Sequence, residues 1–150
     1  MAIPVKHYPQ VYFEDVDVGA VIPPHSITFD TRKMAMFSSI CADFFPSHFD
    51  TRWATEKSHH PAAIAHGLHL NCELSQMLTN WIGPNGMLKK LRVENRALTF
   101  DRDVVTFNGA VTGKHLVNGQ NCLECDIRGQ KADGTLVVKG TATVELPSRG

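Results

Sequence analysis

A carboxylate and an imidazole stand five residues apart in the stretch Asp43-Phe44-Phe45-Pro46-Ser47-His48. In free solution the pKa is about 3.9 for an Asp side chain and about 6.5 for His, so near neutral pH one group is an anion and the other accepts or donates a proton. Pro46 has a fixed φ and stiffens the loop between them. Such a pair can activate a water by proton transfer. The alternative is a solvated loop in which Asp43 and His48 carry no chemistry, and these six residues alone do not decide between the two.

A glycine opens the helix predicted next along the chain, in Ile64-Ala65-His66-Gly67. Glycine costs about 1 kcal/mol inside a helix, so Gly67 suggests a place where another group approaches the backbone closely. Amides of a first turn lack intrahelical partners and lie at the positive end of the helix dipole. Such a site suits a carbonyl oxygen that becomes negative during reaction. Tight packing of the helix start on a sheet is the alternative, and it is compatible with that role.

Together the two motifs resemble the MaoC-like, (R)-specific enoyl-CoA hydratase family of the hot-dog fold. The family signature runs Asp, any residue, Asn, Pro, an aliphatic residue and His, with Ala or Ser six positions after the His. Asp43, Pro46, His48 and Ala54 match it, and the later family element is intact as Ile64-Ala65-His66-Gly67. The opening of the chain, residues 12–19, is also similar to the start of the family.

Three positions depart from the family pattern. Phe45 replaces the amide, Ser47 replaces the aliphatic residue, and Ala42 stands where the family commonly has Gly. These changes leave the Asp/His pair intact and bear on substrate size and rate.

The resemblance implies cofactor-free hydration of a 2-enoyl thioester, or dehydration of an (R)-3-hydroxyacyl thioester, in fatty acid metabolism. It assigns Asp43 and His48 to acid–base catalysis and the Gly67 N–H to an oxyanion hole. Ser75 falls where the family helix often carries a polar serine that orients the loop or substrate, although a hydroxyl bonded to the helix backbone is an equal alternative. The substrate carrier is CoA or acyl carrier protein.

The resemblance also implies a two-fold dimer, or a higher homo-oligomer, in which sheets join edge to edge. A heteromer stays open, because Phe45 is compatible with a non-catalytic subunit that shapes the pocket of a heteromeric dehydratase. A second alternative is a hot-dog acyl-CoA thioesterase, in which a carboxylate drives water onto the thioester carbonyl.

Length and composition favour one enzyme-sized domain over residues 1–150, with 43% apolar residues to form its core. Fifteen basic residues balance fifteen acidic ones, so nothing in the net charge favours nucleic acid or an anionic membrane. No apolar run approaches the roughly 20 residues that span a bilayer, and residues 1–6 lack the apolar core of a secretory signal. We therefore expect a cytoplasmic protein.

Neither the cysteines nor the histidines predict a metal site. The four cysteines are too few and too scattered for a disulfide scaffold, so we expect free thiols. Cys122 and Cys125 lie three apart on a predicted strand and should point to opposite faces, which argues against a shared ion or a redox pair. The four histidines within residues 59–69 match no usual ligand spacing.

Two predicted helices position the candidate residues. Asp30 is suited to cap a helix that runs to about Ala42, so that Asp43 emerges just past its end. The central helix begins at Gly67 and stops at Gly83. The predicted apolar positions are Met34, Phe37, Ile40 and Cys41 in the first helix and Leu70, Leu74, Met77, Leu78, Trp81 and Ile82 in the second.

After residue 86 the sequence predicts antiparallel strands. Asn118-Gly119 and Asp133-Gly134 are typical of hairpin turns. The predicted segments lie around residues 91–93, 98–100, 104–107, 122–128 and 138–146, and a further short strand around residues 26–29 precedes the first helix. A sheet with one apolar face and a helix that can fill it predict the α+β class: a single hot-dog domain, with a curved antiparallel sheet wrapped around a central helix.

Overall fold

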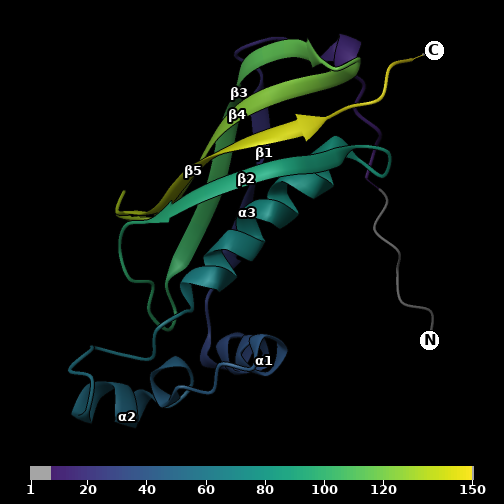
Figure 1. Ribbon diagram of the computed structural model, residues 1–150. Helices are drawn as coiled ribbons and strands as arrows, with labels where there is room; N and C mark the ends of the chain where they lie inside the picture. The colour runs from purple at the N-terminus through teal and green to yellow at the C-terminus, as the bar shows by residue number, and fades with distance from the viewer. Residues whose placement is uncertain (1–7, 150) are drawn as a thin grey trace.

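The computed structural model describes residues 8–149, and in it five antiparallel strands curve around one long helix, α3 (Figure 1). The strand order is β1-β3-β4-β5-β2. The predicted α+β architecture is therefore confirmed. Residues 1–6, on which part of the expectation about location depended, lie outside the described residues. The elements are η1 (Phe13–Asp15), β1 (Val21–Thr28), α1 (Thr31–Cys41), η2 (Pro46–His48), α2 (Thr51–Glu56), α3 (Gly67–Ile82), β2 (Met87–Asn95), β3 (Val104–Val117), β4 (Gln120–Lys131) and β5 (Leu136–Glu145).

Helix α3 fills the concave side of the sheet with the apolar stripe that the sequence predicted. The stripe is buried except at Trp81, which is half-buried. Gly83 ends the helix with φ at 79°, a conformation that favours glycine. Side chains from all five strands complete the core around this stripe.

The two predicted hairpin turns are present. Asn118 and Gly119 have φ values of 52° and 80°, as a two-residue turn between β3 and β4 requires, and Gly134 has φ at 86° between β4 and β5. The predicted strand around Leu98 is wrong: Leu98 is exposed, and Phe100 makes only an isolated bridge to Ile64. That bridge ties the segment before α3 to the connection between β2 and β3.

Helices α1 and α2 form an arm that stands off the sheet near the start of α3 (Figure 1). Asp30 caps α1 as predicted, since its side chain accepts a hydrogen bond from the Lys33 N–H at 2.9 Å. Met34 and Phe37 are buried, but Ile40 is 80% exposed, so its prediction as a core residue is wrong. The period of the helix is unchanged. Ile40 is exposed because it lies near the end of α1, which the sheet does not cover.

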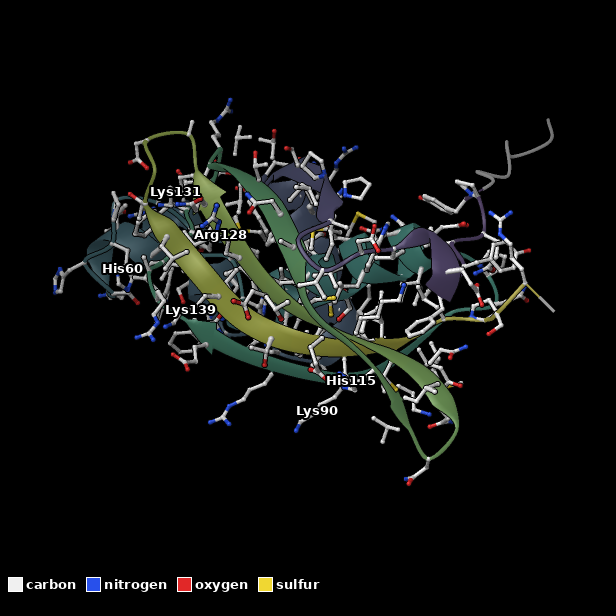
Figure 2. All side chains as sticks on the ribbon, turned by 90° about the horizontal axis from the view of Figure 1, so that it is seen from above. His60, Lys90, His115, Arg128, Lys131 and Lys139 are labelled. Atoms are coloured by element: carbon white, nitrogen blue, oxygen red, sulfur yellow. The ribbon has the colours of Figure 1, made fainter. Side chains whose placement is uncertain are left out.

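The outer face of the sheet is polar with mixed charge. Figure 2 shows the side chains of Lys90, Arg128 and Lys139 on it, and Glu94 pairs in register with Lys139. All four cysteines are free; Cys125 belongs to the core and Cys122, also buried, does not. No helix within residues 8–149 is long and apolar enough to cross a membrane.

Candidate active site

The loop after α1 brings Asp43 and His48 together. Ala42 ends α1 in the left-handed region at φ 55°, and the Asp43 N–H then bonds to the Ser38 carbonyl at 3.2 Å. Pro46 starts the short turn η2, which carries His48 back toward Asp43. As a result, Asp43 Oδ2 and His48 Nε2 lie 3.8 Å apart.

A backbone carbonyl orients the His48 ring. His48 Nδ1 lies 2.7 Å from the Ile64 oxygen, which can only accept, so Nδ1 carries the proton and donates it. In a neutral ring this leaves the Nε2 lone pair directed at the Asp43 carboxylate. Two acceptors 3.8 Å apart cannot bond to each other. A water roughly 2.8 Å from each could donate one hydrogen to Asp43 Oδ2 and the other to His48 Nε2.

His66 is a third member of the group, although the sequence motifs assigned it no role. Its ring stacks on His48 with centroids 3.6 Å apart, and its Nε2 lies 3.7 Å from Asp43 Oδ2. The side chain is only 4% exposed, and burial, followed by the neighbouring His48, lowers its pKa, which favours the neutral ring. The one feature of the sequence that pointed to His66 was its position beside Gly67 in the motif. Spacing along the chain does not show that its ring stacks on that of His48.

The donor atoms of Asp43, His48 and His66 all lie within 4.8 Å of one another, which is a ligand set that zinc could use. The ring geometry is unfavourable for an ion. The two imidazoles are stacked with only 19° between their planes, so their in-plane lone pairs do not converge, and a shared ion would lie well out of both planes. The arrangement fits a hydrogen-bonded water better than a tetrahedral metal.

Gly67 is the first residue of α3 and follows directly on His66, whose ring Nε2 lies 3.7 Å from Asp43 Oδ2. Its N–H, at the first helical position, has no intrahelical acceptor. A Cβ at this position would lie 2.7 Å from Nδ2 of Asn95 in β2. The close packing predicted as the alternative for this glycine is therefore present, and its role as an oxyanion donor stays a prediction.

The structure does not bring Ser75 to the pair. Its hydroxyl donates to the Asn71 carbonyl at 3.0 Å, which is the alternative that the sequence left open. Eight residues of helix separate it from Gly67, or about 12 Å.

Phe45, which stands in the position of the family amide, lies at the mouth of the site. Its ring packs edge-on against Trp53 with centroids 4.8 Å apart and lies 6.4 Å from the His48 ring. The residue is about half exposed, and Phe44 beside it is also exposed. The Phe45 backbone also joins the pair, because its N–H donates to Asp43 Oδ1 at 3.2 Å and its carbonyl accepts from the His48 N–H at 3.0 Å.

The fold can be compared with those of known proteins. The chain is 26% identical to the (R)-hydratase from A. caviae involved in PHA biosynthesis, with a TM-score of 0.79 over 89% of this chain and 99% of that one. The unliganded R-hydratase PhaJ1 from Pseudomonas aeruginosa gives a TM-score of 0.84 at 20% identity, over 93% of this chain and 88% of that one. The ChsH1–ChsH2 complex from Mycobacterium tuberculosis gives 0.76 at 22% identity, over 87% and 98%.

No curated protein matches the chain significantly. The family profile described as MaoC like domain matches residues 18–139, which include the Asp43 loop, the start of α3 and most of the sheet. The chain therefore belongs to the MaoC-like dehydratase family of hot-dog proteins.

Proposed function

We propose that this protein adds water across the 2,3 double bond of an enoyl thioester, and catalyses the reverse dehydration, with Asp43 and His48 as its acid–base pair. The observation that carries the proposal is the 3.8 Å separation of Asp43 Oδ2 and His48 Nε2, two acceptors suited to hold one water between them. The water's lone pairs are then free to face the substrate. Membership of a dehydratase family supports the reaction class.

The roles follow from the movement of charge. The water oxygen forms a bond to C3 while the pair removes one of its protons, and the π electrons move onto C2 and the thioester oxygen. The Gly67 N–H stabilises that oxygen as it becomes negative, a contribution of about 3 kcal/mol for a donor of this kind. The pair then returns a proton to C2, so that water is added and no cofactor is consumed.

The names of two similar structures support an (R) configuration at C3 of the product. Two of the similar structures are named (R)-hydratases, and the same arrangement in this chain would give the (R)-3-hydroxyacyl product. We assign the substrate to the acyl-CoA class, or to the equivalent acyl carrier protein thioester.

The test is an absorbance assay of the purified chain against a series of enoyl-CoA substrates, with Asp43→Asn and His48→Ala as variants. Each should lower the rate by about two to four orders of magnitude, as loss of an acid–base group does. Asp50→Asn is the matched control, because Asp50 caps α2 through the Trp53 N–H at 3.0 Å and Asn is an equally good cap. Normal hydration by folded Asp43→Asn would remove Asp43 from the mechanism, and release of free thiol would identify a thioesterase.

We further propose a homodimer formed through β2. Among the described residues, β1 and β2 are the edges of the sheet. Pro23 and Pro24 interrupt β1, and proline cannot donate to a strand partner, so β2 is the edge better suited to pair. Sedimentation would show the dimer, and a monomer would contradict it.

One neighbour favours a second assembly, since the ChsH1–ChsH2 structure is a complex of two different proteins. A chain that served only as the non-catalytic partner in such a complex would not hydrate enoyl-CoA by itself. Hydration by the purified chain would reject that role.

A further inference from the structure

A buried carboxylate lies in α3, two turns beyond the start of the helix. Glu73 is only 8% exposed, and carboxylates are seldom buried unless they are paired. It is paired twice: Oε2 lies 2.7 Å from Nε2 of His25 in β1, and Oε1 lies 3.4 Å from Nε2 of His69 in α3. The proposed reaction uses none of these three groups.

Glu73 orients the ring of His69. Nδ1 of His69 is buried and has no hydrogen-bond partner among residues 8–149, so the carboxylate is the polar partner of this imidazole, and the Phe29 ring packs edge-on against it with centroids 4.9 Å apart. The ring lies flat on Phe37 of α1, with centroids 4.3 Å apart and 3° between the planes. A turn of the ring about its bond to Cβ would break this stack.

Phe37 is directly connected to the arm segment that carries Asp43. The carbonyl of the next residue, Ser38, accepts the hydrogen bond from the Asp43 N–H at 3.2 Å. The Ser38 hydroxyl also lies 3.5 Å from Nε2 of His66. A shift of this part of α1 would therefore move Asp43 relative to His48.

Other contacts also hold α1: the Thr31 N–H donates to Asp101 Oδ1 at 2.7 Å, and the Phe37 ring packs on His66 with centroids 5.3 Å apart. The buried residues of the helix are Met34, Phe37 and Ser38, and the arm stands off the sheet (Figure 1). The parallel stack of Phe37 on His69 is the closer of the two ring contacts that Phe37 makes with the start of α3.

We infer that Glu73 is a positioning residue for Asp43, acting through the stack of His69 on Phe37. The inference rests on the proposed hydratase function for its effect on rate, and on the structure alone for its effect on the arm. Each carboxylate oxygen of Glu73 faces a different imidazole, so in Glu73→Gln one of these two positions becomes an NH2 donor and no longer accepts. The His69 ring then loses its fixed plane.

The experiment compares kcat and KM of Glu73→Gln, Phe37→Leu and the double variant with the wild type. Misplacement of a reacting group lowers the rate of the chemical step, so each single variant should reduce kcat by about ten- to a hundredfold with KM within about twofold. The double variant should be no slower than the worse single one, because both act on the same contact. Phe37→Leu keeps the buried carboxylate and tests the path even if Glu73→Gln fails to fold.

The matched control is Glu124→Gln, the same chemical change at a partly exposed carboxylate of β4 that accepts from Thr143. It should leave kcat unchanged. A kcat of Glu73→Gln within twofold of the wild type would overturn the inference, as would a double variant whose losses multiply.

Amide hydrogen exchange provides a readout that does not depend on activity. Exchange over α1 (Thr31–Cys41) should quicken in Glu73→Gln and stay as in the wild type in Glu124→Gln. Unchanged protection of α1 in Glu73→Gln would refute the inference that Glu73 helps to hold α1 in place. An inactive wild type would instead refute the proposed function, and exchange would still decide whether Glu73 holds the arm.

Discussion

Replacement of Gly67 by proline would remove one N–H from the candidate oxyanion site while leaving the helix intact. Gly67 is the first residue of α3, the position at which proline is favoured because the lost N–H has no intrahelical acceptor. Proline also requires an extended residue before it, and His66 already has φ −61° and ψ 138°. The backbone therefore accepts the change without rearrangement.

Comparison with Gly67→Ala separates the loss of kcat caused by the missing N–H from the effect of the added Cβ on packing. Both variants introduce a Cβ about 2.7 Å from Nδ2 of Asn95, the far end of an exposed side chain that can move away. Only proline removes the N–H. Loss of one oxyanion donor typically lowers kcat by about 10²–10³, or about 2.7–4 kcal/mol, and we expect that factor between the alanine and proline variants.

The assay is the rate of enoyl-CoA hydration at saturating substrate, with thermal unfolding of each variant to confirm that α3 is folded. Alanine should retain most of the activity. If the folded proline variant were as fast as the alanine variant within about threefold, the Gly67 N–H would not stabilise the transition state and the site would need another donor.

Three further predictions concern single residues. Ser75→Ala should leave kcat within about twofold of the wild type, because its hydroxyl is bonded to the Asn71 carbonyl; a tenfold loss would show that it touches substrate. Ala42→Gly should stabilise the fold by about 0.5–1 kcal/mol in denaturant unfolding, because Ala42 has φ at 55°, and a destabilised variant would contradict this. Burial lowers the pKa of His66 below its value of 6.5, so the unfolded chain takes up a proton more readily; stability should fall as the pH drops below about 6.5, and His66→Gln should flatten that fall in unfolding curves.

Local features of the fold could be predicted because neighbouring residues specify them. The cap at Asp30, the stop at Gly83 and the turn at Asn118-Gly119 each depend on the chemistry of one or two residues. The stripe of α3 was predictable for a similar reason, since its period requires no knowledge of what covers it. Ile40 shows the limit, because the same periodicity was present and the surface to cover it was not.

The sequence by itself determined the antiparallel sheet, the central helix and the two motifs that contain Asp43, His48 and Gly67. Tertiary structure decided the 3.8 Å approach of Asp43 to His48, and also which histidine joins them, because the stacking of His66 on His48 depends on where the arm meets the start of α3. It likewise decided that Glu73 is buried and paired across two elements. The stack of His66 on His48 and the pair of Glu73 with His25 join residues far apart in the chain, and even for Asp43 and His48 the spacing along the sequence does not encode the distance between the side chains.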